Sequence, residues 1–79
     1  MKTIDEVYAE MTYKQAEHQL QLIGGICEAA RILGRSLTAD QRNTILSVRE
    51  KACILGMSVN MQNTIEMEGA AIVRESLKS

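Results

Sequence analysis

Apolar side chains recur at helical spacing along most of this chain, and no stretch alternates apolar and polar residues as a half-buried strand does. The pattern divides into three segments, which are separated near Gly34 and Gly56. Proline is absent, so the glycines supply most of the breaks between elements. We therefore predict an all-α fold, a single domain over residues 1–79 with a long first helix and two shorter helices.

The first predicted helix begins at a capping box formed by Thr3 and Glu6 and ends at Gly34, so it is roughly thirty residues long. Its apolar positions follow helical spacing in two groups on either side of an almost wholly polar stretch, residues 12–19. The groups are Ile4, Val7, Tyr8 and Met11, and then Leu20, Ile23, Cys27 and Ala30. Residues 22–33 are apolar on two sides of the helix. We expect this stretch to be the most buried part of the chain.

Two glycines, Gly24 and Gly25, lie inside that helix and cost about 2 kcal/mol of helix propensity relative to alanines. One interpretation is a kink or a break, and the other is the close approach of a second helix to a backbone without side chains. Because the apolar spacing from Leu20 to Cys27 passes through the glycines without a shift, we favour a continuous helix, straight or kinked.

The second predicted helix has a capping box of Thr38 with Gln41 and ends at Gly56. Its apolar stripe consists of Ile45, Val48, Ala52 and Leu55. The third helix begins near Ser58 or Asn60. One side of it carries Met61, Ile65, Gly69, Ile72 and Val73. The connections of about three to five residues predict antiparallel or angled packing of neighbouring helices.

Residues 28–38 (EAARILGRSLT) are echoed by residues 50–60 (EKACILGMSVN), with six of the eleven positions identical. Each segment is the end of one helix, a glycine, a serine in the turn and the cap of the next helix. Two copies do not make a solenoid. We interpret the echo as shared turn chemistry that supports both helix boundaries.

The spacing of Ala52, Gly56 and Ser58 resembles the turn of a helix-turn-helix DNA-binding motif. The resemblance covers residues 50–66 and implies a dimeric transcriptional regulator. Its basic face would be assembled from Arg42, Arg49, Lys51 and Arg74. Gln62, however, occupies a position that is normally apolar, and the recognition helix would lack basic residues to anchor phosphates over most of its length. DNA binding is therefore the second hypothesis.

The composition favours association with another protein. Nine basic against ten acidic residues give a net charge of -1, whereas nucleic-acid binders normally carry a basic excess. The chain has no Phe or Trp and only two Tyr, so a core of small side chains has to stabilise a short domain. We therefore expect a homodimer.

Candidate catalytic and metal-binding residues are few. His18 is the only histidine, and Cys27 and Cys53 are too few for a four-ligand zinc site within one chain. We interpret His18 as solvated or interfacial and the cysteines as small buried hydrophobic residues. Glu6 and Glu10 share an acidic helix face, and no phosphate-binding loop occurs. The sequence predicts no enzyme, no cofactor and no metal.

The sequence thus predicts a cytoplasmic, non-enzymatic regulator, adaptor or inhibitor that binds protein sterically through a helical surface, of the kind that phages and mobile elements encode. The start of the chain lacks the apolar region of a signal peptide, and no apolar run could span a membrane. Methionines suit adaptable binding surfaces, and Met57 lies in a turn where we expect it to be exposed. The candidate partner-binding residues are Ile4, Val7, Tyr8, Met11, Met57 and Met61. The first four should extend beyond the three-helix core onto a second subunit or a partner.

Overall fold

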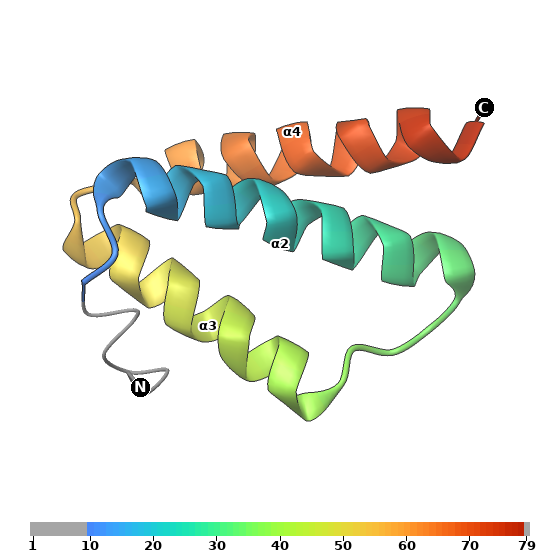
Figure 1. Cartoon of the computed structure of the whole chain (residues 1–79), viewed down its shortest axis with the longest axis horizontal. Coiled ribbons are helices and arrows are strands. Elements are labelled where there is room, and N and C mark those ends of the chain that lie inside the picture. The colour runs from blue at the N-terminus through green and yellow to red at the C-terminus, as the bar shows by residue number, and fades with distance from the viewer. Residues whose placement is uncertain (1–9, 79) are drawn as a thin grey trace.

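The computed structural model describes residues 10–78, which form three α-helices and no strand. Helix α2 spans Tyr13–Leu33, α3 spans Ala39–Ile54 and α4 spans Val59–Lys78. Helices α2 and α4 run in the same direction, while α3 runs back along α2 (Figure 1). The predicted all-α, three-helix architecture is confirmed. The first helix is the longest, although its 21 residues exceed α4 by only one.

Helix α2 begins later than the apolar pattern predicted. Thr12 has extended backbone angles, its hydroxyl accepts a bond from the Gln15 amide at 3.2 Å, and the Gln15 side chain accepts from the Thr12 amide at 2.9 Å. This capping box begins α2 at Tyr13, so one helix running from Thr3 to Gly34 is wrong. The predicted cap at Thr3 and Glu6 lies outside the described residues.

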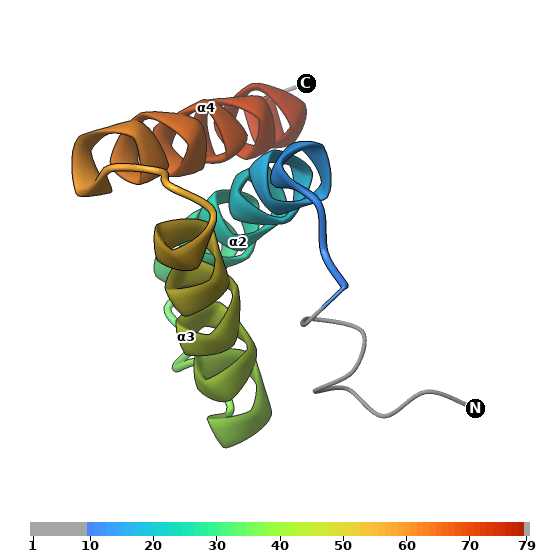
Figure 2. The ribbon, with the colours of Figure 1, turned by 90° about the vertical axis from the view of Figure 1, so that its left-hand side faces the viewer.

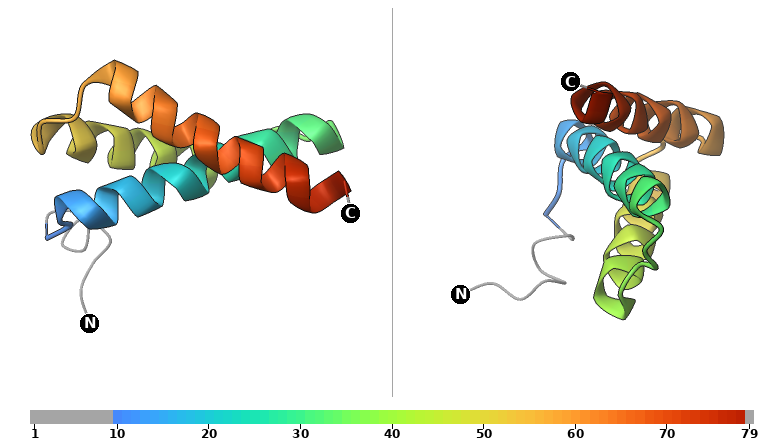
Figure 3. Two further views of the ribbon diagram at one scale, coloured as in Figure 1. Left: turned by 90° about the horizontal axis from the view of Figure 1, so that it is seen from above. Right: turned by 90° about the vertical axis from the view of Figure 1, so that its right-hand side faces the viewer.

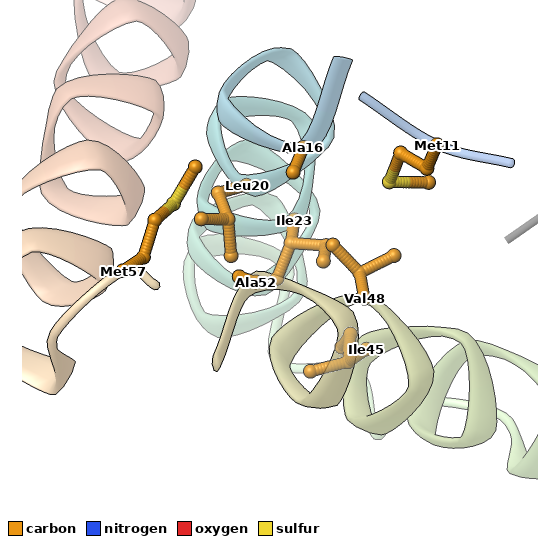
Figure 4. Packing of buried hydrophobic residues seen from close by; sticks show 8 residues of the cluster. All are labelled: Met11, Ala16, Leu20, Ile23, Ile45, Val48, Ala52 and Met57. Carbon is orange, nitrogen blue, oxygen red and sulfur yellow. The ribbon is translucent and has the colours of Figure 1, made fainter. Parts of the chain in front are cut away.

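Met11 precedes this cap and is buried in the core, where only 8% of it is exposed. It stands just before the N-cap, and Ala16 stands four residues after the cap, which are the two positions of a hydrophobic staple. Both side chains belong to the same apolar cluster (Figure 4). The expectation that Met11 extends beyond the core is therefore wrong.

The glycine pair lies inside an unbroken α2, and both glycines lie against α4. Figure 3 shows how α4 crosses α2. A Cβ atom on Gly24 would lie 1.8 Å from the carbonyl oxygen of Glu66, and one on Gly69 would lie 1.8 Å from the carbonyl oxygen of Gln21. The two backbones can approach this closely only because both residues lack side chains. The prediction of a continuous helix is confirmed, and the close approach of a second helix accounts for the glycines.

Side chains of α2 and α3 form most of the apolar core (Figure 4). Leu20 and Val48 are its largest fully buried side chains. The whole cluster consists of Met11, Ala16, Leu20, Ile23, Ile45, Val48, Ala52 and Met57. The predicted stripe on the second helix is thus confirmed at its buried positions, Ile45, Val48 and Ala52.

The second half of α2 is far less buried than expected. Leu22, Ile26 and Leu33 are 47%, 41% and 59% exposed. Helices α3 and α4 pack on different sides of α2, and no described helix packs on its third side (Figure 2). The expectation that residues 22–33 are the most buried part is therefore wrong, because the chain has no further described helix to cover them.

The two echoed segments end their helices with the same geometry. The Arg35 amide donates to the Ala30 carbonyl at 2.9 Å, and the Met57 amide donates to the Ala52 carbonyl at 3.0 Å. Gly34 and Gly56 supply the positive φ angles, 67° and 97°, that such a cap requires. Shared turn chemistry thus accounts for the echo, and both predicted glycine ends are confirmed.

The cap at the end of α3 also turns Met57 inward, so that only 4% of it is exposed. In this type of cap, the residue after the glycine commonly contacts the last turn of the helix, and here Ala52 of that turn is buried beside it. The expectation that Met57 is exposed is wrong for this reason. The predicted caps at the starts of α3 and α4 are present, at Thr38 with Gln41 and at Ser58.

Candidate functional site

The crossing of α2 and α4 leaves an open groove on each of its two flanks. The apolar groove has a volume of about 500 Å³. It is lined by His18, Gln21, Leu22, Gly25, Ile26, Ala29, Gly69, Ile72 and Val73. The polar groove has a volume of about 470 Å³. It is lined by Gly24, Cys27, Glu28, Arg31, Asn63, Glu66, Met67 and Ala70.

The apolar groove presents large aliphatic side chains to solvent. Leu22 and Ile26 of α2 and Ile72 of α4 are all more than 40% exposed. No acidic residue, lysine or arginine is among its lining residues, and Gly25 and Gly69 contribute no side chain. Contiguous exposed apolar surface of this kind is typical of sites that bind other proteins.

In the polar groove, Glu28 is held by two arginines. Its carboxylate accepts hydrogen bonds from Arg31, one turn further along α2, and from Arg74 of α4. Only 7% of Glu28 is exposed. The bonds from Arg31 and Arg74 lower the pKa of Glu28 below its usual value despite the opposing effect of burial. The charge of Glu28 therefore braces the α2–α4 pair and is not available to a ligand.

A second ion pair lies on the same flank, between α3 and α4. Arg49 donates from Nε to one Glu66 oxygen at 3.1 Å and from Nη2 to the other at 2.6 Å. The hydrogen bonding to Glu66 raises the pKa of Arg49. Burial raises the pKa of the neighbouring Cys27 thiol, against the opposing charge of Arg49. The thiol is therefore protonated at neutral pH and is a poor nucleophile.

The predicted partner-binding residues do not form one surface among the described residues. Met11 and Met57 are in the core, whereas Met61 is 44% exposed and accepts a hydrogen bond from the Tyr13 hydroxyl at 2.8 Å. Ile4, Val7 and Tyr8 lie outside the described residues. Exposed large apolar side chains are found instead on residues 22–33 and on α4, and also on α3 at Leu46 and Ile54. The sequence signal for the exposed part of α2 is the second apolar side of residues 22–33, which by itself indicates burial rather than an exposed surface.

The three residues considered for metal or redox chemistry, His18, Cys27 and Cys53, have different surroundings. His18 is exposed at the edge of the apolar groove. Cys27 is partly buried, but Cys53 is exposed, so the expectation of two buried cysteines is wrong for Cys53. Its sulfur accepts a hydrogen bond from the Gln62 amide at 3.1 Å. Within residues 10–78, no group of three or more His, Cys, Asp or Glu side chains could hold a metal ion.

The segment that resembles a helix-turn-helix has some features of that motif. Ala52 is fully buried and Gly56 has a positive φ. Gln62 is buried too, and its side-chain amide also donates to the Met57 carbonyl at 3.3 Å. A polar side chain is therefore buried with hydrogen-bond partners at a position where the motif normally has an apolar residue. Helix α4, however, packs mainly on α2 and contacts α3 only slightly.

Comparison with known proteins adds no function to these surfaces. No protein-family model, no curated protein and no solved structure matches the chain. No described helix is long and apolar enough to cross a membrane. Among residues 10–78, the apolar groove presents exposed aliphatic side chains, whereas the charged groups Glu28 and Glu66 of the polar groove are already bound by arginines.

Proposed function

We propose that this chain is a non-enzymatic, protein-binding module, a small regulator, adaptor or inhibitor that acts by covering a surface of another protein. The apolar groove is the proposed contact site. The observation that carries the proposal is the set of exposed aliphatic side chains, Leu22, Ile26 and Ile72, gathered on one flank of the helix crossing. We include association with a second copy of the chain in this proposal.

The energetics of burial support this role. Covering a fully exposed Leu or Ile contributes about 1.5–3 kcal/mol, so covering these half-exposed side chains contributes about 1 kcal/mol each. The site needs little rearrangement to bind, because glycines hold the two helices together at its floor. A partner with an amphipathic helix could place its apolar face in such a groove.

The chemistry of the other flank supports binding over catalysis. A general acid or base needs a carboxylate or imidazole that can exchange protons with a substrate. In the polar groove, Glu28 and Glu66 are both engaged by arginines, and the Cys27 thiol is protonated. These groups therefore stabilise the fold.

Affinity capture from cells that carry the gene tests the proposal. The wild-type chain is compared with Leu22→Glu and Ile72→Glu, which place a charge in the groove, and with Leu46→Glu as the matched control. Leu46 lies on α3, is 62% exposed and does not line the groove. We expect the same protein to be captured by the wild type and the control but not by the groove variants. Equal capture by all four chains would reject the groove as the contact.

The alternative is a dimeric helix-turn-helix DNA-binding regulator that uses residues 50–66. The buried Ala52 and the positive φ of Gly56 favour it. Against it, Arg49 and Arg74, two of the four residues of its basic face, are engaged by Glu66 and Glu28. A mobility shift with random duplex DNA at low salt decides between the two, since even non-specific DNA binding is visible there.

A further inference from the structure

The charged groups beside the polar groove are unequal in number. Arg31 of α2 and Arg74 of α4 both donate to the single carboxylate of Glu28. The other ion pair of this flank, Arg49 with Glu66, joins one arginine to one glutamate. One positive charge is therefore left in excess beside Glu28. We call Glu28, Arg31 and Arg74 the arginine cluster.

The hydrogen bonds of the arginine cluster leave most of its donors unused. Arg31 donates to Glu28 through Nε, and Arg74 donates through Nη1. The two terminal nitrogens of Arg31 form no hydrogen bond within residues 10–78. These two nitrogens make up a fork that can bind a carboxylate through two parallel hydrogen bonds. The Arg31 side chain is 69% exposed, so a ligand can reach this fork.

The polar groove beside the fork is larger than one carboxylate. Arg31 lines this groove, whose volume of about 470 Å³ is roughly fifteen times the 30 Å³ that a water molecule occupies in the liquid. Met67 and Ala70 of α4 line it too, and Arg74 follows Ala70 by one turn. The groove therefore has room for a piece of peptide that places one carboxylate at Arg31 and its methylene groups along Met67 and Ala70.

From these observations we propose that the arginine cluster binds a carboxylate of an acidic peptide segment of another protein, with that carboxylate on the fork of Arg31. The inference goes beyond the proposed function, because this site and the apolar groove lie on different flanks of the α2–α4 crossing. Glu28 is only 7% exposed and accepts from both arginines. It holds the guanidinium groups in place before a ligand arrives, which lowers the cost of ordering them.

The charge of the arginine cluster favours a carboxylate over a phosphate. One carboxylate balances the excess of one positive charge. A phosphate monoester carries a charge of about −1.5 to −2 and would leave the site negative beside Glu28 and Glu66. Nucleic acid presents a row of phosphates, which a single excess charge cannot neutralise. The C-terminal end of α2 adds a partial charge of about −0.5, which Arg35 at that end offsets.

An NMR titration of the ¹⁵N-labelled full chain at low salt tests this site. The probe is acetyl-triglutamate amide, and the Nε–H signals of the arginines are followed. We expect the signals of Arg31 and Arg74 to shift, with a Kd on the order of 1 mM. Acetyl-triglutamine amide has the same length without the charges and should shift neither signal.

Three variants separate the fork of Arg31 from the overall charge, with the Arg74 signal as the readout. Arg31→Gln should weaken binding of the triglutamate peptide about tenfold, and Arg31→Lys, which keeps the charge but lacks the planar fork, about threefold. Arg42→Gln removes the same charge on α3, away from the groove, and should change the Kd by less than about twofold. Arg31→Lys also keeps a cation beside Glu28, so it remains informative if Arg31→Gln loses helical structure by circular dichroism.

Equal weakening by Arg31→Gln and Arg42→Gln would overturn this inference, because binding would then follow net charge alone. Unchanged affinity of Arg31→Lys would reject the bidentate contact on which it rests. Inorganic phosphate or random duplex DNA that binds more tightly than the triglutamate peptide would contradict the choice of a carboxylate.

The proposed function can fail separately from this site. Leu22→Glu lies in the apolar groove and should leave the Kd of the triglutamate peptide within about twofold of wild type. Peptide binding that survives Leu22→Glu while capture of the partner is lost would support both proposals. A wild-type chain that captures a partner through the apolar groove but binds no triglutamate peptide would reject this inference alone.

Discussion

Helix α2 packs against its two neighbours in different ways. Against α3 it uses aliphatic side chains, with Leu20 and Val48 buried completely. Against α4 it uses the backbone, because Gly24 and Gly69 remove the side chains that would keep the helices apart. The first contact gains stability from the apolar area that it buries, and the second gains it from close fit and from the ion pairs beside the crossing. The two contacts should therefore respond differently to substitutions that add or remove carbon atoms.

The largest effect is expected for Gly69→Ala. In an ordinary helix this change stabilises by up to about 1 kcal/mol. Here the new methyl group would overlap the Gln21 carbonyl oxygen, so α4 has to move away from α2. We expect a loss of about 3 kcal/mol or more in the free energy of unfolding, measured with urea.

Gly25→Ala is the matched control for that change. Its Cβ would lie 2.9 Å from the Cγ2 atom of Val73, a side chain that can rotate away, rather than against backbone. The gain in helix propensity should offset most of the cost, so we expect stability within about 1 kcal/mol of wild type. Equal losses for Gly69→Ala and Gly25→Ala would contradict the backbone contact at the crossing.

Leu20→Ala tests the side-chain contact with α3. Removing this fully buried side chain leaves a cavity, and we expect a loss of about 2–4 kcal/mol by the same urea measurement. Leu46→Ala on the exposed side of α3 is the control, with a change of about 0.5 kcal/mol or less. If Leu20→Ala lowered the free energy of unfolding no more than Leu46→Ala does, the side-chain contact between α2 and α3 would be contradicted.

The Glu28 ion pairs make the α2–α4 contact sensitive to acid. The pKa of Glu28 is lowered from its usual 4.5, so its contribution is complete above that value and is lost as the pH falls through the lowered pKa. Wild type should therefore be more stable than Glu28→Gln at pH 7, and the difference should shrink below about pH 4.5. Thermal unfolding of both chains between pH 7 and pH 3 measures this, and a constant difference would refute it.

The smallest effect is expected for the Arg49–Glu66 pair. Glu66→Gln should cost about 0.5–1 kcal/mol at low salt, because the pair is bidentate but Arg49 is partly exposed, and less in 1 M salt. Glu75→Gln is the control, since Glu75 and its partner Lys78 are both mostly exposed. Urea unfolding at two salt concentrations compares them, and identical losses would show that bidentate geometry adds nothing here.

Local signals predicted the parts of this fold that depend on a few neighbouring residues. The cap at Thr38 with Gln41 and the ends at Gly34 and Gly56 form within one or two helical turns, so adjacent residues suffice to specify them. The true start of α2 is also a local signal, since Thr12 and Gln15 form a capping box. It was missed because the apolar spacing on both sides of it suggested one continuous helix.

The candidate site depended on how the helices are arranged, which the apolar pattern does not contain. Leu22 and Ile26 are apolar in the same way as Leu20 and Ile23, and only the positions of α3 and α4 decide which pair is covered. The small residues from Gly69 to Ala71 indicate a surface where a neighbouring helix can come close, as α2 does at Gly69, but they do not indicate which helix it is. The apolar groove follows from both facts, so it could not be predicted from spacing alone.

Helices α2 and α4 touch backbone to backbone around one crossing, where Gly24 meets Glu66 and Gly69 meets Gln21, so any change in the angle between the two helices would turn them about that crossing. Two side-chain contacts between α2 and α4, one on each side of the crossing, hold the angle between the helices. The Tyr13 hydroxyl donates to Met61 near the start of both helices, and Arg74 donates to Glu28 beyond the crossing. A partner that pushes α2 and α4 apart on one flank would have to stretch these two contacts. The width of the apolar groove therefore depends on these four residues, which do not line it, as well as on the lining glycines Gly25 and Gly69.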